Sequence, residues 1–127
     1  MTVGPIDVAQ VERYSEAARD HNPVHLDAEF ARRIGLSGPI VHGMFVMGQF
    51  ERLIRRWTTD QVVEDVSVRF TKPVPVGSAL TLQVRLAQAT PLEDGRVRTL
   101  LRLVATVDRA VVAIGTATVA GSRLELN

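Results

Sequence analysis

Hydrophobic residues in the first part of the chain recur at the three- and four-residue intervals of an α-helix. Over residues 8–19 the apolar positions follow this spacing, and Asp7 stands directly before them as a candidate N-cap. A second, short helix is predicted over residues 28–34, with Asp27 as its cap and Gly35 as its C-terminal stop. The chain therefore opens with two helices separated by a loop.

Residues 40–57, IVHGMFVMGQFERLIRRW, form the longest predicted helix. Its first half is apolar on nearly every side, so we expect that half to be buried on all faces, whereas the second half is amphipathic. Gly43 and Gly48 lower the helix propensity of this segment. Their presence indicates that a backbone or a ligand approaches closely at these two positions.

From residue 62 onward, hydrophobic and polar residues alternate with the period of two that is typical of β-strands. Short turns divide this part into four strands, and a short edge strand is also predicted near the N-terminus: residues 62–71, 80–86, 96–107, 111–120 and 2–6. Helices followed by strands joined through short turns predict an α+β fold, in which the long helix covers one face of an antiparallel sheet. Because such a sheet leaves a strand edge exposed, we expect a second copy of the chain to extend it.

The composition indicates one domain, residues 1–127. The net charge is +1, from 15 basic and 14 acidic residues, which argues against a nucleic-acid partner bound through bulk charge. The absence of cysteine excludes disulfides and a thiolate nucleophile. The N-terminus lacks the pattern of a signal peptide, and each apolar run is too short to span a bilayer. We therefore expect a cytoplasmic protein that does not associate with membranes.

Asp20 and His25 place a carboxylate and an imidazole on either side of the turn Asn22-Pro23. Pro23 removes a backbone donor and disfavours a helical Asn22, so we expect a non-helical bend that ends the first helix and fixes the two side chains relative to one another. Such a pair is suited to proton transfer. Asn22 is interpreted as structural, its amide binding loop backbone groups. The alternative is that Asp20 caps a helix end and that His25 packs beneath Pro23, bonded to a carbonyl.

His42 and Gly43 stand at the entry to the long helix. In one interpretation they only form a tight helix start. In the other, the Gly43 amide is unpaired in the first turn and points at a substrate oxygen, where the free amide and the helix dipole stabilise negative charge.

A metal site is a further alternative, because Asp20, His21, His25 and His42 lie close together in the sequence. We expect no metal, since Pro23 prevents the helix that would bring His21 and His25 onto one face. No HExxH or cysteine-rich pattern is present either. His21 is expected to be an exposed loop residue.

The segments DHNPVHLDAEFA, GPIVHGM and VSVRFTKPVPVGSALTLQV together resemble the MaoC-like hydratases and dehydratases, the (R)-specific enoyl-CoA hydratase branch of the hotdog-fold superfamily. The resemblance covers nearly the whole chain. It implies a long helix wrapped by a curved antiparallel sheet, with two such units normally joined into one continuous sheet.

For the site, the resemblance implies that Asp20 and His25 hold the catalytic water and that the Gly43 amide binds the thioester carbonyl. It also implies that no metal or organic cofactor takes part. Ala18-Arg19 stand where many members have Ser-Gly, at positions that shape the loop rather than perform chemistry.

Many relatives carry a small hydroxyl residue early in the long helix, whereas this chain has Gln49 and Glu51. We take these two residues, together with His42, as candidate pocket residues, and we expect Gln49 and Glu51 to alter substrate preference.

The resulting hypothesis is reversible, stereospecific addition of water to a trans-2-enoyl thioester of coenzyme A or acyl carrier protein, by a homodimer. One alternative is a hotdog thioesterase that uses Glu51, the acidic residue of the long helix. The other is one subunit of a heterodimer with a different hotdog chain.

Overall fold

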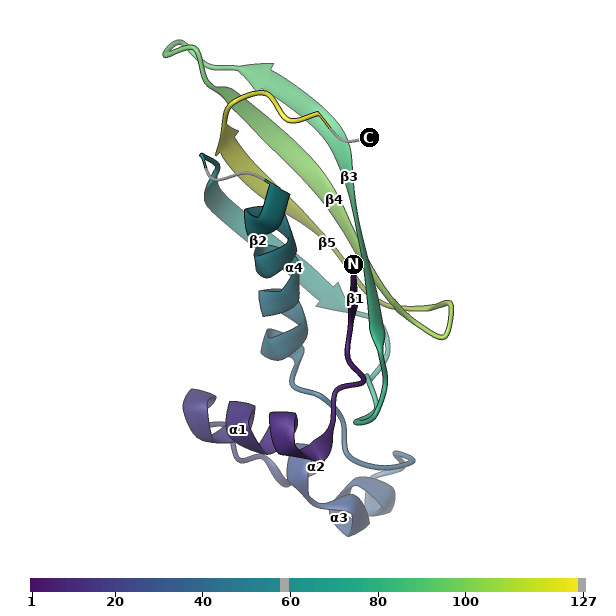
Figure 1. Ribbon diagram of the computed structural model, residues 1–127. Helices are drawn as coiled ribbons and strands as arrows, with labels where there is room; N and C mark the ends of the chain where they lie inside the picture. Colours follow the sequence, from purple (N-terminus) through teal and green to yellow (C-terminus); the bar gives the residue numbers. More distant parts are fainter. Residues whose placement is uncertain (58–59, 126–127) are drawn as a thin grey trace.

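The computed structural model describes residues 1–57 and 60–125, in which α4 lies along one face of a curved antiparallel sheet and α1–α3 gather beyond its N-terminal end (Figure 1). The strand order in the sheet is β1-β3-β4-β5-β2. The elements, in chain order, are β1 (Thr2–Val3), α1 (Val8–Ala18), α2 (Pro23–Leu26), α3 (Ala28–Arg33), α4 (Gly43–Trp57), β2 (Val62–Phe70), β3 (Leu80–Pro91), β4 (Val97–Val107) and β5 (Ala110–Gly121). The predicted α+β architecture is confirmed.

Strand β4 shows how the alternating pattern builds this sheet. Leu101 and Leu103 are at most 1% exposed and belong to the same hydrophobic core as Phe50 of α4. A tight turn at Asp108 and Arg109, whose φ angles are 49° and 68°, then reverses the chain into β5. Two successive residues with positive φ are the backbone of a two-residue hairpin whose twist suits the flanking strands.

Helix α4 begins at Gly43 rather than at Ile40, and it is not buried on all sides. Phe50 faces the sheet and is fully buried, whereas Met44 is 63% exposed. The prediction of complete burial is wrong because one sheet covers only one side of the helix. Ile40 lies before the helix and pairs with Pro75 in an isolated β-bridge. No helix in the described part of the chain is both long and apolar enough to cross a membrane.

Helix α1 has the predicted cap and a clear stop. The Asp7 carboxylate accepts the Gln10 amide at 2.8 Å, and the Gln10 side chain accepts the Asp7 amide at 3.0 Å, which is a capping box. The helix ends at Ala18, because Arg19 adopts the left-handed conformation with φ 55° and ψ 37°.

Pro23 has a different position from the one that the sequence predicted. It opens the short helix α2, and the Asn22 side chain caps this helix by accepting the Val24 amide at 3.0 Å. The prediction of a non-helical turn is therefore wrong for the residues after the proline, because a missing N–H costs nothing in the first turn of a helix. Asp27 caps α3 as predicted, and that helix ends at Arg33.

The sheet has an edge at each end of its strand order. β1 is shorter than predicted and pairs only Thr2 with Thr81 and Val3 with Leu80. β2 forms the opposite edge. That a second copy extends one of these edges stays a prediction, which light scattering on the purified protein tests.

Candidate active site

The loop that carries Asp20 is shaped by hydrogen bonds on both sides of this residue. Its amide donates to the Ser15 carbonyl at 3.0 Å, directly after the left-handed Arg19. Its Oδ1 atom accepts the Asn22 amide at 3.3 Å, while the Asn22 side chain turns to the Val24 amide. Asn22 thus has the loop-forming arrangement inferred from the sequence. The second carboxylate oxygen of Asp20, Oδ2, remains directed toward His25.

His25 lies on α2 with one ring nitrogen fixed and the other facing Asp20. Its Nδ1 atom is 2.7 Å from the Ile40 carbonyl oxygen. Because that oxygen can only accept, Nδ1 carries the hydrogen, and in the neutral ring Nε2 is left as an acceptor. Nε2 lies 4.0 Å from Asp20 Oδ2, and the two side chains are 11% and 49% exposed, respectively. This separation is too long for a direct hydrogen bond.

His42 is buried behind this pair. Its Nε2 atom is 3.0 Å from Ser15 Oγ and 3.2 Å from the Asp20 carbonyl oxygen. Its ring stacks on that of His25, with centroids 3.7 Å apart and an interplanar angle of 24°. Burial, together with the neighbouring His25, lowers the pKa of His42 from its ordinary value of 6.5, whereas the bond to the Asp20 carbonyl opposes the shift. His42 is therefore neutral at pH 7.

The first turn of α4 presents a free backbone amide. The His42 carbonyl accepts the Phe45 and Val46 amides at 3.1 and 3.3 Å, so His42 is the residue before the helix. The Gly43 amide has no hydrogen-bond partner among the residues that the structure describes. A free amide in the first turn, at the positive end of the helix dipole, is suited to bind an oxyanion.

The two glycines of α4 differ in their surroundings. A Cβ atom on Gly43 would lie 2.9 Å from the Phe70 ring, so the close neighbour at this position is a side chain rather than the predicted backbone, and the approach of a ligand stays a prediction. A Cβ on Gly48 would have no described neighbour within 4 Å, so no described backbone segment of this chain approaches there, and the approach of a ligand stays a prediction. Gly43 leaves the space beside the free amide open.

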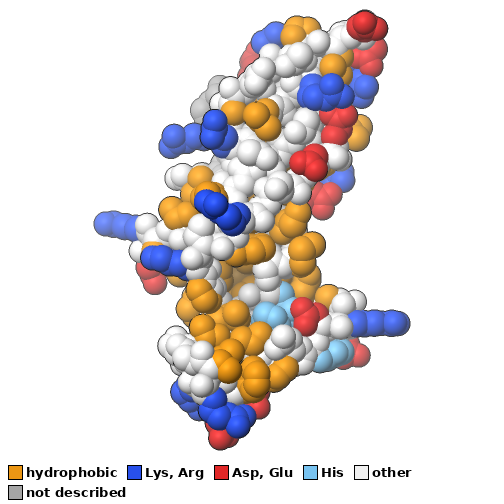
Figure 2. All heavy atoms as spheres, turned by 180° about the vertical axis from the view of Figure 1, so that it is seen from behind, with side chains coloured by type: hydrophobic (Ala, Val, Ile, Leu, Met, Phe, Trp, Pro, Cys, Tyr) orange, Lys and Arg blue, Asp and Glu red, His pale blue; other side chains and the backbone are white. Residues whose placement is uncertain are grey.

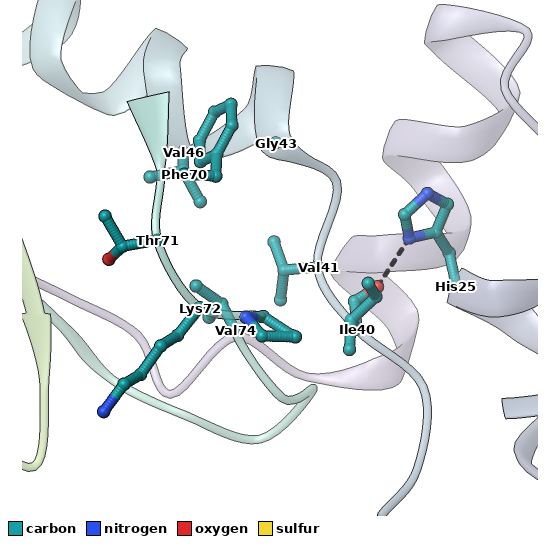
Figure 3. A pocket seen from close by; sticks show the side chains of 10 residues that line it. His25, Ile40, Val41, Gly43, Val46, Phe70, Thr71, Lys72 and Val74 are labelled. Atoms are coloured by element: carbon teal, nitrogen blue, oxygen red, sulfur yellow. Dashed lines mark hydrogen bonds between the residues drawn. The ribbon is translucent and has the colours of Figure 1, made fainter. Parts of the chain in front are cut away.

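A pocket of about 370 Å³ is lined by both His25 and Gly43 (Figure 3). Figure 2 shows hydrophobic side chains gathered next to one of the histidine regions on this face of the molecule. Figure 3 shows the Lys72 side chain pointing away from both His25 and Gly43. The lining is mainly apolar and consists of His25, Ile40, Val41, Gly43, Val46, Phe70, Thr71, Lys72, Pro73 and Val74.

Three of the candidate pocket residues do not line this pocket. His42 lies behind His25, as described above. The side-chain amide of Gln49 donates to the backbone carbonyl of Phe45 at 3.4 Å. The Glu51 carboxylate accepts two hydrogen bonds from the Arg55 side chain at 2.8 and 2.9 Å. Both side chains are hydrogen-bonded along α4 itself.

Asp20, His25 and His42 each bring one potential metal-ligating atom to within 4.8 Å of the others. The stacked rings are a poor fit to a shared ion, because a nitrogen lone pair lies in the plane of its ring and nearly parallel rings do not direct their lone pairs at one point. His25 Nδ1 and His42 Nε2 are also bonded to carbonyl oxygens. His21 lies apart, exposed and 3.1 Å from Glu16. The absence of a metal stays an expectation.

Sequence reasoning missed two contributions to the site. Phe70, Thr71 and Lys72 reach the pocket from the end of β2, and nothing in their spacing indicates that they lie near α2. Ser15 is buried against His42. Its position, four residues after the buried Val11 and thus on the same helix face, is a signal that could have found it.

Fold and site together define a class of protein. A long helix packed on one face of a curved antiparallel sheet is the α+β hotdog fold, and here Gly43 at the helix N-terminus lines an apolar pocket together with His25, which faces Asp20. The chain belongs to the MaoC-like domain family, whose model matches residues 3–107. Strand β5 follows that segment and pairs between β4 and β2 in the same sheet.

The most similar relatives include hydratases and dehydratases. The (R)-specific enoyl-CoA hydratase of Aeromonas caviae is 31% identical over 113 residues, which are 87% of this chain and 83% of that protein. A mitochondrial 3-hydroxyacyl-[acyl-carrier-protein] dehydratase of Arabidopsis thaliana is 34% identical over 84 residues, which are 66% of this chain but only 49% of that protein. The chain thus spans about half the length of this plant relative.

Among solved structures, the fold is similar to that of the (R)-hydratase from A. caviae involved in PHA biosynthesis. The TM-score is 0.83 at 27% identity, and the alignment covers 94% of this chain and 89% of that one. The aligned share of this chain is thus larger than the segment of residues 3–107 that the family model matches.

Proposed function

We propose that this chain catalyses the reversible addition of water to a trans-2-enoyl thioester, which gives the (3R)-3-hydroxyacyl thioester. The observation that carries the proposal is the 4.0 Å separation of His25 Nε2 from Asp20 Oδ2, with His25 lining the same pocket as Gly43, whose amide is free. Two relatives support the substrate class, since one is named for an enoyl-CoA and the other for an acyl-carrier-protein thioester.

The separation of the pair fits one bridging water molecule. Both facing atoms, His25 Nε2 and Asp20 Oδ2, are acceptors, and polar atoms more than 3.5 Å apart are commonly joined through a water. A water that donates one O–H to each atom keeps an oxygen lone pair free. With an enoyl group in the pocket, that lone pair attacks C3.

In the proposed reaction, the water oxygen bonds to C3 and its proton passes to Asp20. The π electrons of the C2–C3 double bond move toward the thioester oxygen, which becomes negative and accepts the Gly43 N–H. The pair then returns the proton to C2 on the face that the water attacked. General acid/base groups contribute a factor of about 10²–10⁴, and one oxyanion donor about 10²–10³.

The thioesterase alternative has less support. It requires a carboxylate on α4 at the substrate, whereas Glu51 is bonded to Arg55 and does not line the pocket. Assembly with a different hotdog chain would leave the proposed chemistry unchanged, because Asp20, His25 and Gly43 all come from this chain.

Hydration of a four-carbon trans-2-enoyl-CoA by the purified protein tests the proposal. The loss of enoyl absorbance measures the rate, and chiral chromatography identifies the configuration of the product. We expect the (3R) product and no release of free thiol. Asp20→Asn and His25→Ala should each lower kcat by roughly 10²–10⁴.

Matched controls come from the same loop. Asp27→Asn makes the same exchange at a helix cap, where asparagine also caps well, and His21→Ala removes the exposed histidine. Both controls should keep wild-type turnover. Normal turnover in Asp20→Asn, or thiol release without hydration, would contradict the proposal.

A further inference from the structure

His42 contacts both halves of the site without lining the substrate pocket. Its side chain reaches the Asp20 carbonyl and the His25 ring, and its own carbonyl accepts the Phe45 and Val46 amides in the first turns of α4. It is 2% exposed. A residue in this place cannot touch the substrate, but it can fix the groups that do.

We propose that His42 is a positioning residue: the hydrogen bond from its Nε2–H to the Asp20 carbonyl holds Asp20 at the distance from His25 that one water bridges. This inference rests on the proposed hydratase function. The role is distinct from proton transfer, which belongs to Asp20 and His25.

The hydrogen on Nε2 follows from the partners of the ring. The Asp20 carbonyl oxygen, 3.2 Å away, can only accept, so Nε2 must donate. Ser15 Oγ, 3.0 Å from the same nitrogen, then shares that hydrogen as a second acceptor. Since the ring is neutral, Nδ1 carries a lone pair, and this atom is buried with no partner among the described residues.

The unpaired Nδ1 argues against a mere packing role. Burying an acceptor without a donor lowers stability, and an apolar ring of similar size would avoid this loss. A phenyl ring could still stack on His25 and contact Tyr14, whose ring centroid is 4.8 Å from that of His42. What only the histidine supplies at this position is the Nε2–H donor.

Asp20 needs such an anchor because little else holds it. Its side chain is half exposed, and apart from His42 its described hydrogen bonds are those to Ser15 and Asn22. Loss of the bond to its carbonyl would allow the carboxylate to move relative to His25 Nε2. Misplacement of a reacting group by about 1 Å can cost roughly 10² in rate.

Two variants separate the donor from the ring. His42→Phe keeps a stacking ring and removes the donor, whereas His42→Gln removes the ring and can place an amide N–H near the position of Nε2. We expect kcat for four-carbon enoyl-CoA hydration to fall about 10²-fold in His42→Phe, with KM unchanged because His42 does not line the pocket. His42→Gln should recover at least a tenth of the wild-type kcat.

Phe50→Leu is the control for a general loss of stability, since Phe50 is fully buried in the core and does not line the pocket. It should lower the thermal midpoint and leave kcat unchanged. Equal losses of kcat in both His42 variants, or losses that follow the thermal midpoint as in Phe50→Leu, would overturn the inference.

A substrate-free measurement separates this inference from the proposed function. In ¹⁵N-labelled wild-type protein at pH 7, NMR should show that His42 carries its hydrogen on Nε2, in slow exchange with water, and that Nδ1 is unprotonated. A hydrogen on Nδ1 would overturn the positioning role. The expected NMR result in a protein without hydratase activity would instead refute the proposed function and leave the anchoring of Asp20 in place.

Discussion

Strands β4 and β5 and the loop around Asp20 are held in place by different interactions. In the strand pair, backbone pairing continues from Val97 to Val107, and side chains such as Leu101 and Ala117 are completely buried between the sheet and α4. Around Asp20 the side chains are mostly exposed, and hydrogen bonds fix the backbone instead.

This difference separates stability from chemistry. In the strand pair, loss of a side chain removes buried apolar area, which lowers the free energy of unfolding but leaves the remote catalytic groups where they were. In the loop, loss of one polar group removes little apolar area but alters the position of the carboxylate. Mutations in the two regions should therefore affect different measurements.

The largest effect on stability is expected in the strand pair. Leu101 on β4 and Leu86 on β3 lie directly opposite one another, but Leu101 is fully buried and Leu86 is 39% exposed. Leu101→Ala should lower the free energy of unfolding by about 2–5 kcal/mol, and Leu86→Ala by clearly less. Urea unfolding measures both changes.

At temperatures where Leu101→Ala is still folded, its kcat and KM should equal those of the wild type. A fall in kcat without loss of folded protein would show that the sheet and the site are coupled, and the proposed separation would then be wrong.

Gly43, at the start of α4, tests whether loss of one polar group in the site changes catalysis rather than stability. Gly43→Pro removes the amide donor at the first position of α4, where proline is tolerated, and should lower kcat by roughly 10²–10³. Gly43→Ala keeps the donor but adds a Cβ atom that would lie 2.9 Å from the Phe70 ring. Gly43→Ala should raise KM more than it lowers kcat. Because proline adds the same Cβ atom, the alanine variant is the control for the contact of that atom with the Phe70 ring. A folded proline variant, checked by circular dichroism, that keeps wild-type turnover would place the oxyanion elsewhere.

The parts of the molecule that sequence predicted well are those set by neighbours in the chain. The Asp7 and Asp27 caps and the alternating strands depend on residues a few positions away, so propensity and periodicity sufficed. The turn at Asn22-Pro23 indicated Asp20 and His25 as a pair, and the resemblance added the expectation that they hold a water. Pro23 was predicted to lie in a non-helical bend, whereas it opens helix α2. The sequence does not distinguish the two cases, because proline is found both at the start of a helix and after the end of one.

What sequence could not supply depends on contacts between distant segments. The stacking of His42 on His25, and the arrival of Phe70 beside Gly43, result from the packing of α1, α2, β2 and the start of α4. Helix α4 likewise has an apolar sequence on nearly every side, but the number of covered sides is decided by the sheet. Met44 is exposed for that reason.

His42 should make the free energy of unfolding of the protein depend on pH. Because burial lowers its pKa, the folded state binds a proton less readily than the unfolded state. This histidine therefore contributes stability above its ordinary pKa of 6.5, and that contribution is lost as the pH falls through the lower, folded-state pKa. The slope is at most about 1.4 kcal/mol per pH unit.

The difference between wild type and His42→Gln isolates this contribution, since the other titrating groups are common to both proteins. Urea unfolding at pH 7.5, 6.5 and 5.5 should show the advantage of the wild type shrinking toward low pH. A difference that stays constant, or that grows toward low pH, would contradict the lowered pKa of His42.

The smallest expected effect concerns the residue between α1 and the Asp20 loop. Arg19 holds the left-handed conformation, which strains a residue that has a Cβ atom. Glycine removes this strain but also gives the unfolded chain more freedom, which offsets part of the gain. Arg19→Gly should therefore raise the free energy of unfolding by about 0.5 kcal/mol. The adjacent Ala18→Gly is the matched control, because Ala18 is helical and glycine there should cost about 0.5–1 kcal/mol. Opposite signs in urea unfolding would confirm that the strain belongs to one residue. The kcat of Arg19→Gly should stay within about twofold of the wild type, since the bond from the Asp20 amide to the Ser15 carbonyl and the bond from His42 to the Asp20 carbonyl persist. A marked loss of turnover in this more stable variant would show that the loop depends on a restricted Arg19, and the hydrogen bonds would then be insufficient to position Asp20.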